Sequence, residues 1–290
     1  MIKLVLTDLD NTLIPHKPDE PFHAAAISDE GISAIHALLD AGAHFGPVTG
    51  RDPSSMAETF RGDAAAYATG AYANGQLVCL DGETIHREWI PAESLQHASD
   101  ILDSESDGFL VFFDVEGDRP NWGVSRKYRL DDVDTQGMLR VSKLLPEVEG
   151  PTLKAIVRLQ DENNSERVRD LLRSEVPELD FEMPSPTVPV IDIMPKGYGK
   201  GSAVRIIANA LGIGMDEVAT FGDADNDVSM LRAVPNSVAV ASASELAKST
   251  AHWHIPDAME GSVAKAMAQI AEATARGAMP AFMRGGGHLR

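Results

Sequence analysis

The sequence opens with Met1-Ile-Lys-Leu-Val-Leu-Thr-Asp-Leu-Asp-Asn-Thr-Leu13, and this stretch decides the expected fold. Its apolar, partly β-branched run over residues 2–6 predicts a buried strand. Two acids, Asp8 and Asp10, follow at the strand end, before a turn-prone Asn-Thr pair. Side chains alternate along extended backbone, so we expect both carboxylates on one side, repelling each other unless a cation or a shared proton intervenes. Taken alone, the stretch also fits two solvated loop acids.

The composition is that of a globular chain of 290 residues, enough for one large domain or two ordinary ones. The 25 basic and 44 acidic residues give a net charge of -19, which disfavours binding to nucleic acid or to anionic membranes. The single cysteine, Cys79, excludes an intrachain disulfide and a multi-cysteine metal site. The sequence shows neither a signal-peptide pattern nor an apolar stretch of membrane-spanning length. We therefore expect a soluble, cytoplasmic protein.

Strand and helix patterns alternate through the first eighty residues. Ser28 predicts a helix start, residues 44–48 a second strand, and residues 52–55 a second helix start with an early proline. A short strand is expected at 65–68, followed by a hairpin turn at the Asn-Gly pair 74–75. This order predicts an α/β fold built on a doubly wound parallel sheet.

Residues 83–186 do not continue this alternating pattern of strands and helices. Residues 83–186 are too many for a loop and suit an inserted domain of strands and helices. Its strand-like and helical segments lie at 109–115, 153–159 and 165–176. The core pattern is expected to resume with a strand at 190–194. The predicted organisation is a core formed by 1–82 and 187–290 with an α+β insertion at 83–186.

Polar groups recur at one kind of place, the carboxyl end of a strand or the helix start after it. They are Asp8 with Asp10, Thr49, Lys200, and Asp223 with Asn226 and Asp227. In an open α/β sheet these ends share one edge, where ligands bind. Each group alone has an ordinary explanation as a turn, a solvated lysine or a helix cap. Their coincidence at one edge favours a shared site.

The motifs that carry these residues resemble, in order, those of the haloacid dehalogenase superfamily of phosphatases. The matching segments are Asp8-Leu-Asp-Asn-Thr12, Val48-Thr-Gly-Arg51, Lys200-Gly201 and Gly222-Asp-Ala-Asp-Asn-Asp227. The insertion resembles, by position and size, the type IIB cap of Cof-type sugar phosphatases. The resemblance implies a Rossmann-like core and an α+β cap that sets substrate specificity.

The resemblance also implies a role for each matched residue. Asp8 would be the nucleophile that forms an aspartyl-phosphate, Asp10 the acid and base, and Thr49 and Lys200 would hold the transferring phosphoryl group and offset its charge. Mg²⁺ would be bound by Asp8, the Asp10 backbone carbonyl and Asp223, with Asn226 and Asp227 either binding the ion directly or lying in the shell around its ligands. Further substrate- or phosphate-binding candidates are Thr12, Gly50, Arg51, Asn74 and Asn226. Arg51 could equally brace its own loop.

The expected activity is Mg²⁺-dependent hydrolysis of a small phosphorylated metabolite such as a sugar phosphate. A carboxylate nucleophile splits this slow reaction into two displacements, and a hard cation neutralises the phosphoryl charge. The nearest alternative is a phosphomannomutase-like mutase, for which the insertion offers the cations Arg126, Lys127, Arg129, Arg140, Lys143, Lys154 and Arg158. A non-catalytic phosphometabolite-binding protein is disfavoured because every motif position is filled. A monomer and a homodimer both remain open.

Overall fold

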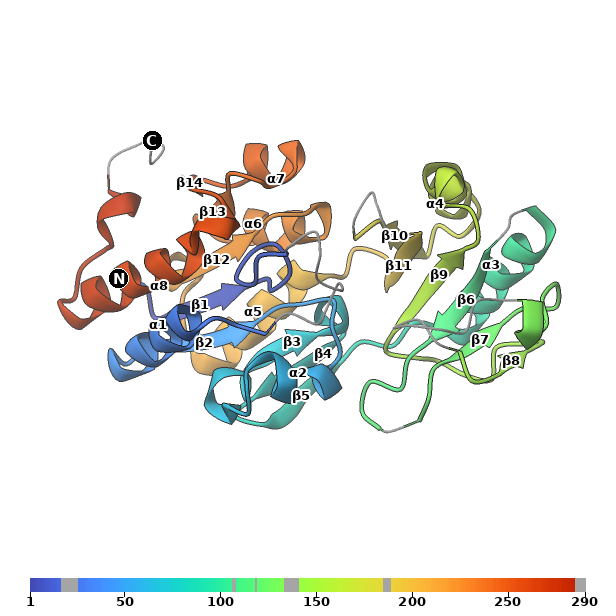
Figure 1. Ribbon diagram of the computed structural model, residues 1–290, viewed down its shortest axis with the longest axis horizontal. Helices are drawn as coiled ribbons and strands as arrows, with labels where there is room; N and C mark the ends of the chain where they lie inside the picture. The colour runs from blue at the N-terminus through green and yellow to red at the C-terminus, as the bar shows by residue number, and fades with distance from the viewer. Residues whose placement is uncertain (17–25, 106–107, 118, 133–140, 185–188, 285–290) are drawn as a thin grey trace. The chain divides into compact units, whose positions relative to one another are not determined.

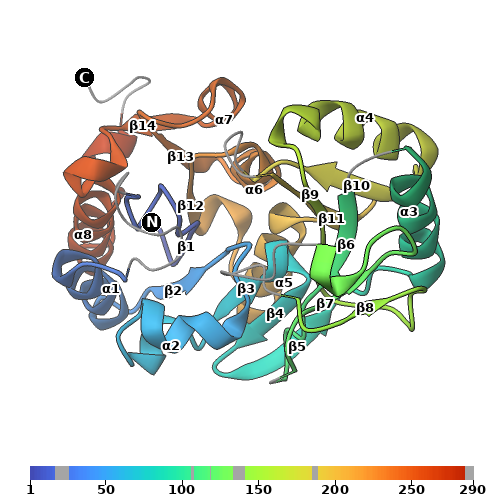
Figure 2. The same cartoon turned by 45° about the vertical axis from the view of Figure 1, so that its right-hand side comes forward.

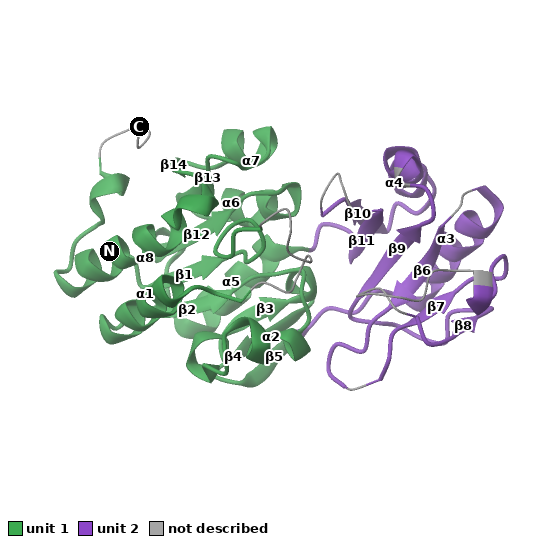
Figure 3. Ribbon diagram, in the orientation of Figure 1, with its two compact units in different colours: residues 1–86, 199–290 green, residues 87–198 purple. Residues whose placement is uncertain are grey.

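The computed structural model describes residues 1–16, 26–105, 108–117, 119–132, 141–184 and 189–284. The chain forms two compact units, which are Met1–His86 with Gly199–Arg290, and Arg87–Tyr198. Figure 1 follows the chain through its elements, and Figure 3 colours the two units separately. The division falls slightly beyond the expected boundaries, at 86/87 and 198/199 in place of 82/83 and 186/187.

The first unit is built on a five-stranded sheet in the order β14-β13-β12-β1-β2. Its strands are β1 (Leu4–Thr7), β2 (His44–Pro47), β12 (Val218–Gly222), β13 (Asn236–Val240) and β14 (Trp253–Ile255). Every neighbouring pair in this sheet is parallel. The strand of the opening stretch lies between β12 and β2, so its carboxyl end is flanked on both sides. The predicted parallel α/β core is confirmed.

Helices cover both faces of this sheet. They are α1 (Asp29–Asp40), α2 (Met56–Thr59), α5 (Lys200–Leu211), α6 (Val228–Ala233), α7 (Glu245–Thr250) and α8 (Ser262–Ala275). The pair α1 and α8 packs together, as does the pair α5 and α6, on the other side of the sheet (Figure 2). Leu4 and Leu6 of β1 are buried in the cluster that contains Val204 of α5. Within the described residues, no helix has the length and apolarity needed to cross a membrane.

A small separate sheet has the order β3-β4-β5, from the strands β3 (Gly70–Tyr72), β4 (Leu77–Leu80) and β5 (Glu83–Arg87). Strands β3 and β4 are antiparallel around the predicted turn at 74–75, which is confirmed. The strand predicted at 65–68 is wrong, because Ala64–Ala66 forms a 3₁₀ turn. The strand starts instead at Gly70, where a Cβ would lie 2.9 Å from the Pro47 carbonyl oxygen. Only glycine allows this close approach to the end of β2.

The second unit combines a six-stranded sheet, in the order β10-β11-β9-β6-β7-β8, with two helices. Its elements are α3 (Ala92–Glu105), β6 (Gly108–Phe112), β7 (Trp122–Val124), β8 (Leu144–Leu145), β9 (Ala155–Leu159), α4 (Ser165–Glu175), β10 (Leu179–Glu182) and β11 (Val190–Pro195). The α+β character of the insertion is confirmed. The strand at 190–194, expected in the core, pairs with β9 and β10 in this unit instead. Ile191 and Ile193 explain the difference, since both are buried in the apolar cluster of this unit.

The close packing of α5 on α6 gives a test of the fold. A Cβ added to Gly201 in the first turn of α5 would overlap the carbonyl oxygen of Ser229, a backbone atom that no rotamer change can move. We expect Gly201→Ala to lower the free energy of unfolding by about 1–3 kcal/mol, measured by urea denaturation. Gly199→Ala is the matched control, since its Cβ would meet only Ser229 Oγ at 3.5 Å. Equal stabilities of the two variants would contradict the packing described.

Candidate active site

A buried lysine lies between two carboxylates at the carboxyl edge of the parallel sheet. Lys200 Nζ donates to Asp8 Oδ1 at 2.6 Å and to Asp227 Oδ1 at 2.5 Å. The Lys200 side chain is only 1% exposed, and that of Asp227 is fully buried. Asp8 follows β1, Lys200 opens α5, and Asp227 ends the turn before α6. Three segments far apart in the sequence therefore meet at one ammonium group.

Local backbone geometry brings the last acidic motif to this point. Asp227 Oδ2 accepts the backbone N–H groups of Asp223 at 2.9 Å and Ala224 at 3.0 Å. Both oxygens of Asp227 are thus engaged, one by the loop and one by Lys200. A Cβ on Gly222 would lie 2.6 Å from the Asp227 Cβ, so this tight loop requires glycine there. The loop places Asp223 beside Asp8, because β12 and β1 are parallel neighbours.

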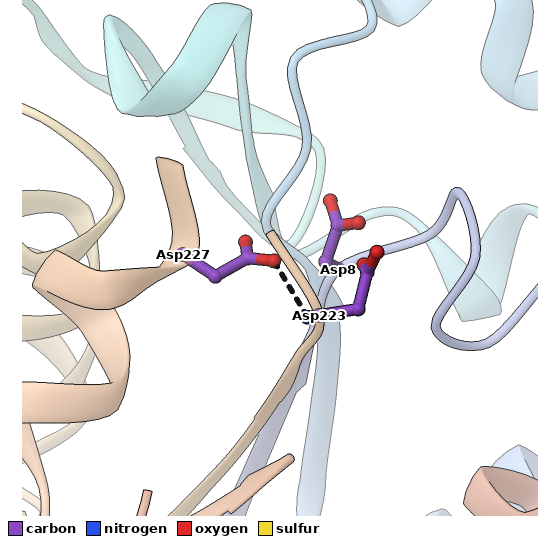
Figure 4. Close-up of side chains that lie close together, drawn as sticks. All are labelled: Asp8, Asp223 and Asp227. Carbon is purple, nitrogen blue, oxygen red and sulfur yellow. Dashed lines mark hydrogen bonds between the residues drawn. The ribbon is translucent and has the colours of Figure 1, made fainter. Parts of the chain in front are cut away.

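The acids of these motifs form a group that can hold a metal ion. Asp8, Asp223 and Asp227 each offer a carboxylate oxygen, and these oxygens lie within 4.8 Å of one another (Figure 4). A set of oxygen ligands suits a hard divalent cation. Within the described part of the chain, Asn226 Oδ1 is buried next to this motif without a hydrogen-bond donor. The donor set and this orphaned amide oxygen both fit a hydrated divalent cation.

The pKa values of this group also indicate a site for a cation. Burial raises the pKa of Asp8 well above its usual value, opposed by Lys200 and reinforced by the carboxylates of Asp227 and Asp223. Burial, and then Asp227, raises the pKa of Asp223 to about 7, although a 2.6 Å hydrogen bond from Thr12 Oγ1 opposes the shift. Burial lowers the pKa of Lys200, but Asp227 and Asp8 outweigh it and raise that pKa above its usual value. One ammonium does not balance three carboxylates, so the site lacks positive charge.

The Asp10 carboxylate has a different partner. Arg51 Nε and Nη2 donate to its two oxygens at 2.9 and 2.5 Å. Asp10 lies beyond the end of β1, in an isolated bridge with Ile14, so the alternation of an extended strand does not apply to it. The acid group of Asp8, Asp223 and Asp227 does not include this carboxylate. A metal contact of the Asp10 backbone carbonyl stays a prediction.

Four of the predicted phosphate-binding residues lie together around Asn74. This residue is buried at φ +56°, a left-handed conformation that Asn tolerates better than most residues. Its N–H donates to the Thr49 carbonyl oxygen at 2.9 Å, and its Oδ1 accepts from Asn226 Nδ2 at 3.2 Å. A Cβ on Gly50 would lie 3.2 Å from the same Oδ1. The turn at Thr49 and Gly50 is thus joined to the last motif through one amide.

Two polar residues of the site carry no sequence signal. Thr59 Oγ1 accepts from Arg51 Nη1 at 2.8 Å, and Ser229 Oγ accepts the Gly201 N–H at 3.0 Å. Both lie in or beside short helices and outside the four motifs. Thr12, expected at the phosphate, gives its hydroxyl to Asp223 Oδ1. These contacts arise from the packing of distant segments, which no motif encodes.

The core is a parallel sheet with acidic loops at its carboxyl edge, and the α+β unit is inserted between two parts of its sequence. This arrangement is that of the haloacid dehalogenase-like class of enzymes. A family model described as haloacid dehalogenase-like hydrolase matches residues 5–267, and the chain belongs to this family. The predicted family is confirmed. The predicted enzyme class is confirmed as well, a hydrolase whose named relatives include phosphatases.

Individual relatives match to different extents. The 5-amino-6-(5-phospho-D-ribitylamino)uracil phosphatase YcsE of Bacillus subtilis is 25% identical over 92% of this chain and 94% of its own length. The chloroplastic endoribonuclease YBEY of Arabidopsis thaliana is 36% identical over 62 residues, but the match spans only 11% of that protein. The structure of the subclass IIB sugar phosphatase BT4131 superimposes with a TM-score of 0.74, at 21% identity, over 91% of this chain and 97% of that one. That likeness shows the shared fold.

The central ion pair predicts a large effect of removing its cation. Lys200→Met leaves Asp8 and Asp227 buried without their cation, so we expect the free energy of unfolding to fall by about 3–5 kcal/mol. Urea denaturation at pH 8 with a chelator present measures this loss. Lys196→Met is the matched control, because Lys196 is mostly exposed in its pair with Asp180 and should cost less than about 1 kcal/mol. A Lys200→Met protein as stable as the control would contradict this account.

The raised pKa of Asp223 predicts how stability depends on pH when divalent cations are chelated. Its folded pKa of about 7 exceeds the unfolded value of about 3.9, so the folded state binds the proton more tightly. Its stabilising contribution is full below about pH 4 and is lost as the pH rises through about 7. We expect Asp223→Asn to remove this loss between pH 4 and 8 in thermal unfolding, whereas the neighbouring exposed variant Asp225→Asn keeps it. Parallel curves for Asp223→Asn and wild type would rule this out.

Proposed function

We propose that this chain is a Mg²⁺-dependent phosphatase that hydrolyses a small phosphorylated metabolite through an aspartyl-phosphate on Asp8. The observation that carries the proposal is the buried contact of 2.6 Å between Lys200 Nζ and Asp8 Oδ1 at the edge of a haloacid dehalogenase-like core. A fixed cation beside a carboxylate stabilises the charge that develops when the carboxylate attacks a phosphoryl group. The acid group around Asp8 supplies a place for a cation.

Two displacements complete the reaction. In the first, an Asp8 carboxylate oxygen attacks phosphorus, the ester P–O bond breaks, and Asp10 gives its proton to the leaving oxygen. In the second, water attacks phosphorus and passes a proton to Asp10, and the bond between Asp8 and phosphorus breaks. Inorganic phosphate leaves, and both carboxyl groups return to their starting protonation states. Asp10, with a partly exposed side chain, is reachable for both transfers.

The remaining residues orient the phosphoryl group and neutralise its charge. Lys200 offsets charge on Asp8 and on the phosphoryl group, and Thr49 at the start of its turn offers a hydroxyl to the phosphoryl oxygens. Mg²⁺ held by Asp8, Asp223 and Asp227 would bring a dianionic phosphate next to carboxylates that otherwise repel it. The orphaned Asn226 Oδ1 would accept from a water of that ion.

A sugar phosphate is the substrate class that the comparisons support. YcsE is named for a phosphorylated ribityl substrate and BT4131 for sugar phosphates, and each matches this chain over more than nine-tenths of its length. We assign specificity to the inserted unit, Arg87–Tyr198. The net charge of -19 disfavours nucleic acid and anionic membranes as partners.

Two of the described cations that could serve the mutase alternative have partners in the inserted unit. Arg126 is paired with Asp100 and Glu147 of its own unit, and Lys154 lies over the ring of Phe113 at 4.5 Å. Arg140, another of the cationic candidates, lies outside the described residues. Hydrolysis is the reaction that we propose.

The nucleophile assignment has a direct test. Asp8→Asn removes the attacking oxygen's charge, so turnover of p-nitrophenyl phosphate with Mg²⁺ should fall by at least about 10⁴-fold. Asp225→Asn, an exposed acid of the last motif, serves as the control and should keep wild-type activity. Release of p-nitrophenolate followed at 405 nm gives the rates, with ~1 mM substrate as a starting concentration. An Asp8→Asn enzyme with wild-type activity would refute the mechanism.

A further inference from the structure

The guanidinium of Arg51 is held by protein groups on three of its nitrogens. Nε and Nη2 donate to the two oxygens of Asp10, and Nη1 donates to Thr59 Oγ1 at 2.8 Å. The Arg51 side chain is 3% exposed and Thr59 is buried, whereas the Asp10 side chain keeps 21% of its surface exposed. Of these three residues, Asp10 is the one whose side chain solvent reaches, and the buried guanidinium of Arg51 holds it.

We propose that Arg51 is a positioning residue that sets the direction of the Asp10 carboxyl group, and that it is not a ligand of the substrate phosphate. A two-pronged guanidinium–carboxylate pair fixes both the distance and the relative plane of the two groups. The hydrogen bond to Thr59 holds the guanidinium itself in place. Turning Arg51 toward a substrate would break the three hydrogen bonds that it donates to Asp10 and to the buried Thr59 hydroxyl.

The backbone of Arg51, and not its side chain, makes the contacts that shape the neighbouring turn. Its N–H donates to Thr49 Oγ1 at 3.1 Å, and its carbonyl oxygen accepts the Ala73 N–H at 2.9 Å. These two contacts shape the turn that carries Thr49, and they do not involve the side chain of Arg51. A substitution at Arg51 can therefore release the Asp10 carboxyl group while the backbone contacts of the turn stay in place.

This inference rests on the proposed phosphatase chemistry, in which Asp10 gives a proton to the leaving oxygen and later takes one from water. A carboxylate has about four lone-pair sites, and Arg51 uses one on each oxygen of Asp10. Proton transfer needs the donor and acceptor within hydrogen-bond reach and in line. A carboxyl group that rotates freely meets this condition less often, so both proton transfers slow down while phosphate binding is unchanged.

The test compares two leaving groups of similar shape and different basicity. p-Nitrophenolate departs as its anion, whereas phenolate, being more basic, benefits from a proton. In single-turnover experiments with Mg²⁺, we expect Arg51→Met to leave p-nitrophenolate release near the wild-type rate. We expect phenol release from phenyl phosphate to slow by about 10–100-fold, and phosphate release from both substrates to slow similarly, because water activation also uses Asp10. The substrate concentration that gives the half-maximal first-step rate should stay at the wild-type value, as should the Mg²⁺ dependence of that step.

Other variants keep the inference testable if Arg51→Met folds poorly. Thr59→Val removes the hydrogen bond between the guanidinium and the Thr59 hydroxyl. It should change the ratio of the p-nitrophenolate and phenol release rates in the same direction as Arg51→Met, but by a smaller factor. Arg51→Lys, which cannot form the two-pronged pair, should fall between Arg51→Met and wild type. Arg276→Met breaks an exposed pair with Glu272 and should leave every rate unchanged. Circular dichroism confirms that each variant is folded.

Distinct outcomes overturn the inference. An equal loss with both leaving groups would mean that Arg51 supports the site only structurally. A raised substrate concentration for the half-maximal first-step rate, with unchanged maximal first-step rates, would make Arg51 a ligand of the substrate. A wild-type protein that releases phosphate from neither substrate would instead refute the proposed function, and the inference with it.

Discussion

A lysine ammonium buried between two carboxylates is the interaction on which this site depends. Lys200 joins Asp8 after β1 to Asp227 before α6, so one charge holds together segments of the chain that are 192 and 27 positions apart. Removing charges from water is costly, and such a group persists only when its geometry is good and its hydrogen bonds are satisfied. Loss of the lysine would leave two buried carboxylates without their cation, and the same lysine orients the proposed nucleophile, so stability and function share one contact.

The imbalance of charge around this lysine explains why the site suits a cation. Asp8, Asp223 and Asp227 converge on one point, and Lys200 offsets only part of their charge. The backbone at Gly222 passes so close to Asp227 that a Cβ there would lie 2.6 Å from the Asp227 Cβ. Burial and mutual repulsion therefore raise the pKa values of Asp8 and Asp223, and a bound divalent cation would relieve that strain.

The two acids of the opening stretch have become different groups. Asp8 is buried against a lysine, whereas Asp10 meets the planar guanidinium of Arg51 and stays partly exposed. Two carboxylates in unlike surroundings can take unlike chemical roles, which a reaction with separate attack and proton-transfer steps requires. The difference comes from their partners, because the lysine that opens α5 meets Asp8 and the arginine that follows β2 meets Asp10.

The sequence by itself determined the family, the parallel core, the α+β character of the insertion and the residues that gather at the sheet edge. Strand-end acids and apolar periodicity are local signals, and parallel strands bring their ends to one edge. Only the tertiary structure decided that residues 190–195 pair within the inserted unit, that Asp10 binds Arg51, and that Thr59 and Ser229 take part. These features depend on which distant side chains pack together. The packing of distant segments is set by the burial of whole elements, and no short motif records it.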